Sequence, residues 1–332
     1  MADVHFLQAV GVSKTYPGPV SSGVRNINLD IVPGKITAII GESGSGKSTL
    51  LRLLYGLMSP DEGQVLFKSE RIWGPEEKLI PGHDEMKMVT QHTDDLNLFA
   101  RVWDNVAAML PSTNVKFKEE QTAAVLGQLN MMELAYKRVA DLSGGEKQRV
   151  AIARAIITKP KVLFMDEPFN QVDTSFREGL QHDIRQIVKE NGITVVMVSH
   201  DPAEVLSMAD ELIVIRNGEI VEAGAPKEMY QSPKYLYTAE LLSNCNVLSA
   251  AEAALCGIST DKESVVIYPE WIRLDSLLKA TKWTVDQILF KGFYEDLILE
   301  NSGVLIRVVN GEHNRFKPGD QIGIKVKKWL EY

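Results

Sequence analysis

The sequence predicts an α/β fold over residues 1–240, followed by a small all-β domain over residues 245–332. The β-branched run Ile36–Ile40 leads through a Gly/Ser loop into leucines at helical spacing, which predicts a strand, a loop and a helix in succession. Two later apolar runs, Val162–Met165 and Ile193–Val198, alternate with helical stretches, as in a sheet covered by helices. In the C-terminal part, short strand candidates separated by Gly and Pro-Gly turns predict a small β-barrel.

The loop after Ile40 fits the pattern of a phosphate-binding loop. Its residues read Gly-Glu-Ser-Gly-Ser-Gly-Lys-Ser-Thr, and the glycines let backbone N–H groups face a phosphate at a helix N-terminus. Lys47 is expected to reach the outer phosphates, and Ser48 to offer an oxygen to Mg²⁺. The alternative is a Gly/Ser turn that only resembles the pattern, and the flanking strand and helix disfavour it. The expected nucleotide contacts are Gly41, Ser43, Gly44, Ser45, Gly46, Lys47, Ser48 and Thr49.

The composition is that of an ordinary globular protein, with 332 residues of which 45% are hydrophobic and 24% charged. The apolar runs are far shorter than the roughly 20 residues that cross a bilayer, so no membrane-spanning segment is expected. Residues 1–5 lack the basic and apolar regions of a signal peptide, which favours a cytoplasmic location. Two cysteines are too few for a disulfide framework. The net charge of −8 gives no basic field, so nucleic acid is not expected as a partner.

The segments around the loop predict antiparallel strands before it and a helical insert after it. Residues 4–32 alternate short apolar stretches with turns, and Tyr16 lies in such a turn. Its ring either stacks on an adenine or only packs against its neighbours. Gln64–Phe67 predicts another strand, and Gln91 ends a further β-like segment. Apolar residues at helical spacing then predict a helical subdomain at about residues 92–157.

A second candidate anion-binding site lies where an Ala-rich helical stretch begins. Residues Leu142–Arg149 read Leu-Ser-Gly-Gly-Glu-Lys-Gln-Arg, and Ser143 with the N–H groups of Gly144 and Gly145 can bind an anion at the helix start. Because one loop already surrounds the phosphates, we expect this helix end to serve a nucleotide held by another subunit. The alternative is an ordinary capped helix in which Ser143 and Glu146 form a capping box, and the two interpretations are compatible.

Two carboxylates and a histidine follow apolar strands, at the edge where ligands bind in open α/β sheets. Asp166 and Glu167 come directly after Val162–Met165. Asp166 is expected to hold Mg²⁺, and Glu167 either to act as general base for the water that attacks the γ-phosphate or to orient that water. His200 follows Ile193–Val198 and is expected to contact the γ-phosphate or that water. Solvated loop acids and a structural histidine are the alternatives.

The rest of the chain predicts a hairpin, a helical stretch and the all-β domain. Leu212–Glu222 contains an Asn-Gly turn, and Ala225–Leu242 is helical in pattern. Phe290 and Phe293 are assigned to core packing rather than to base stacking, since no basic groove accompanies them. The strand candidates of the C-terminal domain are Val265–Tyr268, Ile288–Phe293, Leu297–Leu299, Val304–Val309 and Ile322–Val326.

Taken in this order, the motifs of about the first 240 residues resemble those of the ATP-binding subunits of ABC transporters. The resemblance implies a head-to-tail dimer with two ATP molecules between the Lys47 side of one subunit and the Ser143 side of the other. One departure is Asn170-Gln171-Val172, where the family more often has a small residue and Leu before the Asp. The resemblance further assigns Tyr16 to adenine stacking, Gln91 to catalysis and to coupling Mg²⁺ with the transmembrane partner, Asp166 to Mg²⁺, Glu167 to the attacking water, Asp173 to the dimer contact at the nucleotide, and His200 to the γ-phosphate.

The C-terminal domain resembles the OB-like (TOBE-type) regulatory domain of importer ATPases, on Tyr268-Pro269-Glu270 and Gly319-Asp320. Such importers carry polyamines, ferric iron, molybdate, sulfate or sugars, and the short domain favours the polyamine, iron and oxyanion branches. The resemblance implies an ATP hydrolase, peripheral on the cytoplasmic face of the inner membrane. It is expected to work as a homodimer on separate permease subunits, fed by an extracytoplasmic solute-binding protein. The alternatives are the ATPase of an exporter and a soluble ABC ATPase without a transport role.

Overall fold

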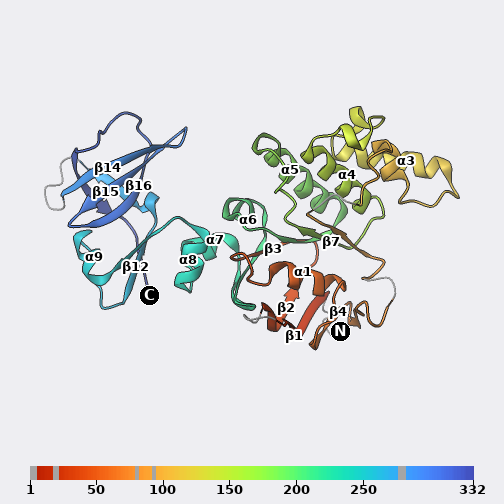
Figure 1. The fold of residues 1–332 in the computed structure, drawn as a ribbon, viewed down its shortest axis with the longest axis horizontal. Helices are drawn as coiled ribbons and strands as arrows, with labels where there is room; N and C mark the ends of the chain where they lie inside the picture. The colour runs from red at the N-terminus through yellow and green to blue at the C-terminus, as the bar shows by residue number, and fades with distance from the viewer. Residues whose placement is uncertain (1–5, 18–21, 79–81, 92–94, 276–281) are drawn as a thin grey trace. The chain divides into compact units, whose positions relative to one another are not determined.

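The computed structural model describes residues 6–17, 22–78, 82–91, 95–275 and 282–332. The chain divides into two compact units, residues 1–226 and 227–332 (Figure 1). The domain bounds that the sequence suggests, 1–240 and 245–332, stay a prediction. In the described part of the chain, no helix has both the length and the apolar character needed to cross a bilayer.

The first unit has the strand and helix succession that the sequence predicts. Its strands are β1 Leu7–Tyr16, β2 Ser22–Ile31, β3 Ile36–Ile40, β4 Glu62–Phe67, β5 Glu70–Arg71, β6 Met86–Val89, β7 Val162–Asp166, β8 Thr194–Val198, β9 Glu211–Arg216 and β10 Glu219–Gly224. Its helices are α1 Lys47–Tyr55, α2 Val102–Ala107, α3 Val115–Gln128, the 3₁₀ turns Met132–Leu134 and Val139–Asp141, α4 Gly144–Ile156, α5 Thr174–Asn191 and α6 Pro202–Met208.

A mixed sheet with strand order β10-β9-β3-β8-β7-β6 forms the centre of this unit. Strands β9, β3, β8, β7 and β6 are parallel to their neighbours, and β10 joins antiparallel to β9. Every residue of β3, β7 and β8 is buried, as expected for parallel strands covered on both faces. Parallel pairing brings the C-terminal ends of β3, β7 and β8 to one edge, where the loop 41–46, Asp166 and His200 follow.

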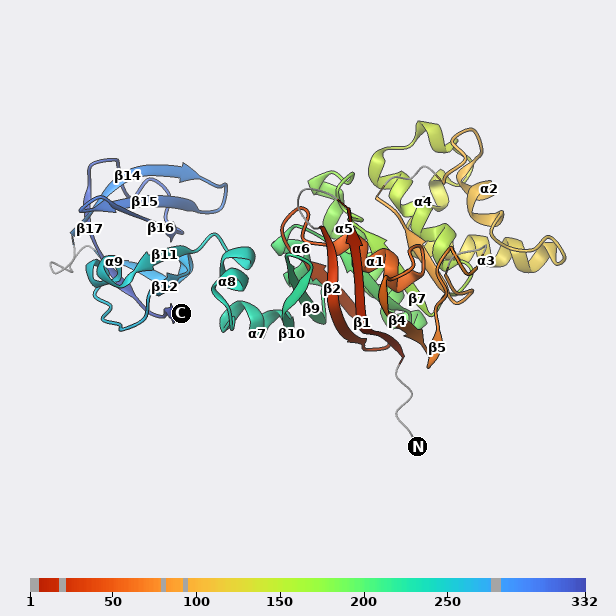
Figure 2. The ribbon, with the colours of Figure 1, turned by 60° about the horizontal axis from the view of Figure 1, so that its bottom comes forward.

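A second, antiparallel sheet with order β2-β1-β4-β5 completes the first unit. Helix α1 contacts β7 and β8 of the central sheet and also β1 and β2, so it lies between the two sheets (Figure 2). Its Leu50, Leu51 and Leu54 are fully buried in the shared core. The predicted N-terminal strands are therefore confirmed, although Tyr16 ends β1 rather than lying in a turn. Of the two turns predicted at residues 16–19 and 21–23, residues 18–21 lie outside the described residues.

The predicted helical insert contains α2, α3 and α4. Its residues 92–94 lie outside the described residues, and its bounds stay a prediction. Helix α4 packs against both α2 and the edge strand β6, so the insert is joined to the central sheet at that strand.

The second unit is built mainly of two antiparallel sheets with orders β11-β12-β18 and β13-β17-β14-β15-β16, and its described residues also form three short helices. The sheets are consistent with the C-terminal β-barrel that the sequence predicts. Trp283, Val285 and Leu297 are among the buried residues of its main core. Phe290 and Phe293 are 72% and 84% exposed at the β14–β15 hairpin, so their assignment to the core was wrong. The elements are α7 Pro226–Gln231, α8 Leu236–Leu242, β11 Asn246–Ser249, α9 Ala250–Leu255, β12 Ser264–Ile267, the 3₁₀ turn Pro269–Trp271, β13 Ile272–Asp275, β14 Lys282–Phe290, β15 Glu295–Asn301, β16 Val304–Asn310, β17 Gln321–Val326 and β18 Leu330–Glu331.

Candidate functional site

The phosphate-binding loop joins β3 to the first turn of α1. Gly46 has a left-handed φ of 103°, and a Cβ there would lie 2.5 Å from the backbone oxygen of Gly23, so only glycine fits. Lys47 is buried, and its Nζ donates to the carbonyl oxygens of Gly41 and Glu42, both at 2.8 Å. The Ser45 hydroxyl is buried without a hydrogen-bond partner in the described structure. An oxygen-rich anion in the loop would supply the partner that Ser45 lacks.

Burial lowers the pKa of Lys47, and the nearby carboxylates of Glu167 and Asp166 oppose that shift. A lysine that is costly to keep charged in its resting position gains more from a phosphate than a solvated lysine does. The loop therefore holds its cation close to the place where a polyphosphate would add negative charge.

Ser48 and Asp166 come together although 118 positions separate them in the sequence. The Ser48 hydroxyl donates to Oδ1 of Asp166 at 3.0 Å, and Arg52 lies 3.8 Å from Oδ2. Burial raises the pKa of Asp166, while the Ser48 hydrogen bond and the Arg52 charge lower it. A hydroxyl and a carboxylate beside a phosphate loop are hard oxygen donors of the kind that Mg²⁺ prefers, so these residues fit that ion.

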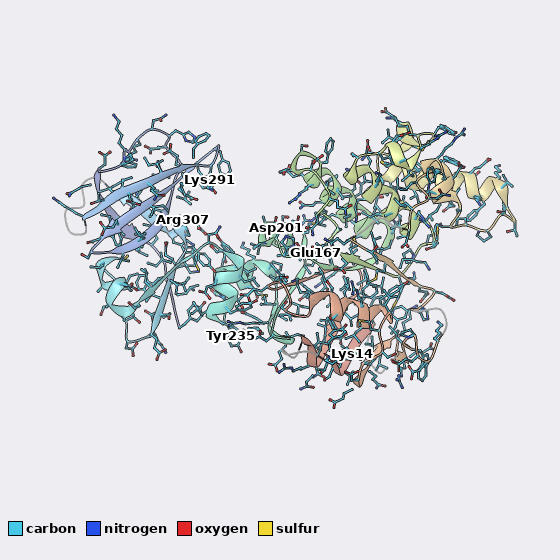
Figure 3. All side chains as sticks on the ribbon, in the orientation of Figure 1. Lys14, Glu167, Asp201, Tyr235, Lys291 and Arg307 are labelled. Carbon is cyan, nitrogen blue, oxygen red and sulfur yellow. The ribbon has the colours of Figure 1, made fainter. Side chains whose placement is uncertain are left out.

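Glu167, Asn170 and His200 form a polar cluster beside Asp166. The backbone of Glu167 is left-handed, with φ 48°, and its N–H donates to the carbonyl of Val198 in β8 at 3.0 Å. Nδ1 of His200 lies 3.4 Å from Oε1 of Glu167, and the Asn170 amide donates to Oε2. Figure 3 labels Glu167, directly after β7, and Asp201, which follows β8. The fold thus brings together the acid and the histidine that the sequence marks separately.

The second helix start has the predicted capping box. Ser143 accepts from the N–H of Glu146, whose carboxylate in turn accepts from the N–H of Ser143. A Cβ on Gly144 would lie 2.4 Å from the carbonyl oxygen of Gln171, so the turn of residues 170–173 lies against this helix start. Asp173 is the N-cap of α5, without a side-chain cap hydrogen bond. Within the described residues, no hydrogen bond or ion pair joins Ser143 or Asp173 to the phosphate loop of the same chain.

Tyr16 and Gln91 are two further residues that the sequence assigns to the site. The Tyr16 hydroxyl donates to Sδ of Met58 at 3.2 Å. Asp61 accepts from the Thr15 N–H at 2.8 Å and from Lys14, and so fixes the backbone just before Tyr16. Gln91 is half-buried and follows the edge strand β6. Among the described contacts, none joins Gln91 to Ser48 or Asp166.

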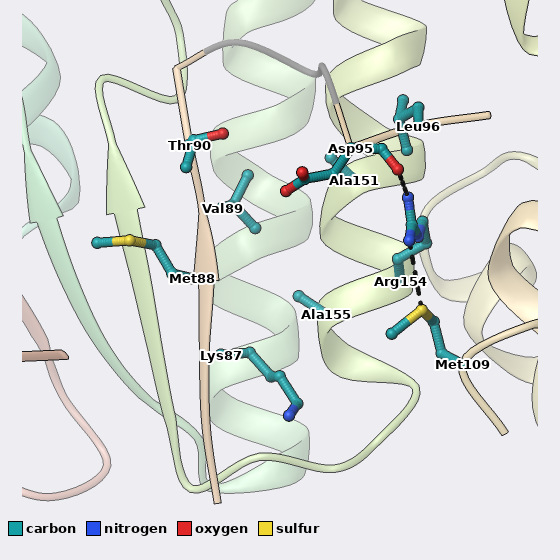
Figure 4. A pocket seen from close by; sticks show the side chains of 10 residues that line it. All are labelled: Lys87, Met88, Val89, Thr90, Asp95, Leu96, Met109, Ala151, Arg154 and Ala155. Carbon is teal, nitrogen blue, oxygen red and sulfur yellow. Dashed lines mark hydrogen bonds between the residues drawn. The ribbon is translucent and has the colours of Figure 1, made fainter. Parts of the chain in front are cut away.

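A pocket of about 120 Å³ is lined by residues of β6, of α4 and of the segment that joins β6 to α2 and α3 (Figure 4). Arg154 of α4 donates to the carbonyl of Asp95 and lies 3.5 Å from Sδ of Met109. Thr90, next to Gln91, lines the same pocket. The lining residues are Lys87, Met88, Val89, Thr90, Asp95, Leu96, Met109, Ala151, Arg154 and Ala155.

Sequence reasoning missed several partners of the predicted site residues. Asn170 stood out only as a departure from a family pattern, and its hydrogen bond to Glu167 was not foreseen. Arg177, which donates to the carbonyl of Val172 and lies near Asp201 and Glu204, was also missed. The spacing of three between Glu167 and Asn170 was the available signal, because a tight turn can bring such residues together.

The phosphate loop between β3 and α1, with its carboxylates at the ends of neighbouring strands, defines a nucleotide-binding α/β protein. The ABC transporter family model matches residues 24–170. The spermidine/putrescine import ATP-binding protein PotA of Vibrio cholerae is 31% identical over 97% of this chain and 91% of its own length. PotA of Pasteurella multocida is 35% identical over 76% of this chain and 74% of its own length.

Solved structures show the same cassette. The structure of cbiO1 from Clostridium perfringens, part of the ABC transporter complex cbiONQ, matches 69% of this chain and 92% of its own at 28% identity, with TM-score 0.63. The dimeric structure of the ATP-binding cassette MJ0796 bound to ADP and Pi matches 67% of this chain and 99% of its own at 26% identity, with TM-score 0.58.

The chain belongs to the ABC transporter family, among its ATP-binding subunits. It is an ATP-binding and ATP-hydrolysing subunit of an ABC import complex. Such a subunit is peripheral to the membrane and works with membrane permease partners and a second ATPase cassette.

Proposed function

We propose that this chain hydrolyses Mg²⁺-bound ATP as a homodimer on the cytoplasmic face of the membrane and drives the import of polyamines. The observation that carries the hydrolytic part is the approach of His200 Nδ1 to Glu167 Oε1 at 3.4 Å, beside the Ser48–Asp166 pair at 3.0 Å. A base, a second polar group and a cation-binding pair then face one phosphate loop. These are the groups that phosphoryl transfer to water requires.

The proposed roles follow from where each side chain lies. Lys47 and the loop N–H groups hold the phosphates, and Ser48 and Asp166 hold Mg²⁺, with Gln91 completing its surroundings. Bound Mg²⁺ neutralises charge on the phosphate oxygens. Glu167 takes a proton from the water that attacks the γ-phosphorus, and His200 stabilises the γ-phosphate. Tyr16 stacks on the adenine, and its anchored backbone before the ring supports that placement.

The homodimer supplies the second half of each site. Ser143, Gly144 and Gly145 lie at the N-terminus of α4 and would face a nucleotide held by the partner, together with Asp173. The separation of this helix start from the phosphate loop within one chain supports that arrangement. The dimeric MJ0796 structure with bound ADP and Pi supports it by analogy.

The pocket between β6 and α4 is proposed as the place where the permease docks. It touches the strand that leads to Gln91 and the helix that begins after Ser143. A segment bound there would contact both of these elements, which suits the coupling of transport to hydrolysis. Met109, Leu96 and Val89 give the pocket an apolar wall, and Lys87 and Arg154 give it cationic groups.

The proposal of polyamines as cargo rests on the relatives, whose names specify spermidine and putrescine import. It selects one of the three solute classes that the short C-terminal domain favours. The cargo itself would be bound by the permease and by an extracytoplasmic solute-binding protein, not by this chain.

Paired variants of the full chain test the hydrolytic roles. Glu167→Gln removes the base but keeps the shape of the site, so we expect ATP to bind and the dimer to accumulate while turnover falls by about a hundredfold or more. Lys47→Ala is the matched contrast, because it should weaken ATP binding itself. Nucleotide binding, dimerisation by light scattering and phosphate release are measured together. Normal turnover by Glu167→Gln would remove Glu167 from its role.

Uptake measurements test the cargo. Cells lacking this chain are complemented with the wild type or with Glu167→Gln, and entry of labelled spermidine, ferric iron and sulfate is followed. We expect the wild type alone to restore spermidine entry and neither chain to change the other two. Restored iron or sulfate entry with unchanged spermidine entry would contradict the polyamine proposal while leaving the ATPase roles intact.

A further inference from the structure

Asn170 holds one oxygen of the Glu167 carboxylate, and nothing in the family comparison assigns it a role. Its side-chain amide donates to Oε2 of Glu167, while Nδ1 of His200 lies 3.4 Å from Oε1. The carboxylate is thus flanked on both oxygens by polar groups that come from different segments. A glutamate side chain has three rotatable bonds, and two partners restrict its rotation more than one does.

The backbone around Asn170 is fixed independently of this contact. The Glu167 N–H donates to the Val198 carbonyl, and the Asn170 N–H donates to the Glu167 carbonyl at 3.3 Å. Phe169, between them, is fully buried, and the Val172 N–H donates to its carbonyl at 3.0 Å. The Asn170 side chain therefore projects from a rigid turn, which is what an orienting group requires.

The chemistry of the amide suits the orientation of a base. An ionised carboxylate only accepts hydrogen bonds, so the NH₂ group of Asn170, and not its oxygen, must face Glu167. An amide neither gains nor loses a proton near neutral pH, so it orients Glu167 without competing for the proton of the attacking water. A carboxylate at position 170 would have the same shape but would repel Glu167.

We infer that Asn170 is a positioning residue that aims the Glu167 carboxylate at the attacking water. The inference rests on the proposed role of Glu167 as general base. It predicts that loss of the amide lowers the rate of hydrolysis and leaves ATP binding unchanged, because the contact is made to the base and not to the nucleotide.

The test compares Asn170→Ala and the isosteric Asn170→Asp in the full chain. We expect kcat for ATP hydrolysis to fall about ten- to hundredfold in Asn170→Ala and at least as far in Asn170→Asp, with KM within about twofold of the wild type. Ser175→Ala, an exposed polar residue in the first turn of α5, is the matched control and should leave both constants unchanged. Unchanged kcat in both Asn170 variants would overturn the inference.

A second measurement separates positioning from a merely structural effect. Asn170→Ala is added to Glu167→Gln, and the residual single-turnover rate and the ATP-driven dimerisation are compared with those of Glu167→Gln alone. A residue that acts only through Glu167 changes neither, since its target is already gone. A further fall in the residual rate, or a loss of dimerisation, would overturn the inference and assign Asn170 to the fold or the dimer contact. Wild-type turnover by Glu167→Gln would overturn this inference and the proposed base together.

Discussion

Asp166 is a site carboxylate whose charge depends on its surroundings. It is buried, and that burial raises its pKa above the ordinary value, while the Ser48 hydroxyl and the Arg52 guanidinium pull it down. A proton and Mg²⁺ would compete for the same oxygens, because only the ionised carboxylate is a good ligand. Because its pKa is raised, protons compete with Mg²⁺ for Asp166 at a higher pH than they would for a solvated aspartate.

We therefore predict that Mg²⁺ binding to the protein–ATP complex releases a growing fraction of a proton as the pH falls from about 8 to about 5. Isothermal titration in buffers of different ionisation enthalpy measures the released protons. Titration of ATP alone in the same buffers gives the protons that the nucleotide itself releases when it binds Mg²⁺. The Asp166→Asn protein should release no more protons than ATP alone. Equal proton release by the wild type and Asp166→Asn would show that Asp166 does not bind the ion.

At the scale of elements, Arg177 of α5 joins two segments that carry site residues. Its Nε donates to the Val172 carbonyl at 3.0 Å, and its NH1 lies 3.4 Å from Oε1 of Glu204 in α6. Ser199, just before His200, donates to the other Glu204 oxygen at 2.6 Å. Burial raises the pKa of Glu204, and the Ser199 hydrogen bond and the Arg177 charge oppose it. Arg177 thus links the 170–173 turn to the segment that carries His200.

Replacing Arg177 by Met should destabilise the first unit in a pH-dependent way. At about pH 8 the buried Glu204 is charged and loses its cation, so we expect a loss of about 1–3 kcal/mol. The variant raises the Glu204 pKa further, so the loss shrinks as the pH falls toward about 5, because a protonated carboxyl needs no cation. Urea unfolding of the wild type and the variant at both pH values measures this loss of unfolding free energy. Adding Glu204→Gln should make the loss independent of pH, and a constant loss in Arg177→Met alone would contradict the argument.

The start of α4 offers a second comparison at this scale. A Cβ on Gly144 would meet the Gln171 carbonyl at 2.4 Å, whereas one on Gly145 would meet a side-chain methyl of Val172 at 3.2 Å. Backbone yields less readily than a side chain. Gly144→Ala should therefore lower the free energy of unfolding by about 1–3 kcal/mol, with a smaller effect for Gly145→Ala. Unfolding is measured without nucleotide, so that contacts to ATP play no part. Equal effects of the two variants would contradict the close approach.

The sequence predicts most of the elements that carry the site, because local patterns determine them. The leucines of α1, the buried run of β7 and the Ser143–Glu146 capping box all act within a few residues. It does not predict the contacts that depend on tertiary structure. The left-handed Glu167 is an example, since glutamate rarely adopts positive φ and the tertiary hydrogen bond to Val198 helps to fix it there.

The C-terminal unit shows the same division. Helix α9 carries a capping box of Ser249 and Glu252, so its start could have been found from the sequence. Strand β18, Leu330–Glu331, could not have been found from the sequence, because two residues show no periodicity. Only their pairing with β12 defines them as a strand. The exposure of Phe290 and Phe293 was missed for a related reason: Phe290 ends β14 and Phe293 lies in the turn that follows, and both side chains leave the core there.

At the scale of the whole molecule, each unit has a core of its own. The first is centred on α1 and the strands around it, with Phe164 fully buried, and the second surrounds the fully buried Trp283. A compact unit with a separate hydrophobic core is the usual requirement for independent folding. Nucleotide would bind the first unit, so its free energy of binding should stabilise that unit in particular.

We expect calorimetry of the full chain to resolve two unfolding transitions, of which only one rises with Mg²⁺ and ATP. Trp283→Ala should lower the Tm of the nucleotide-insensitive transition by about 10 °C or more, because removing a buried tryptophan costs about 3–5 kcal/mol. Phe164→Ala, fully buried in the first unit, is the matched variant and should lower the nucleotide-sensitive transition instead. If Trp283→Ala lowered both transitions equally, the two cores would unfold as one cooperative structure, and the separate stabilities argued from their packing would be wrong.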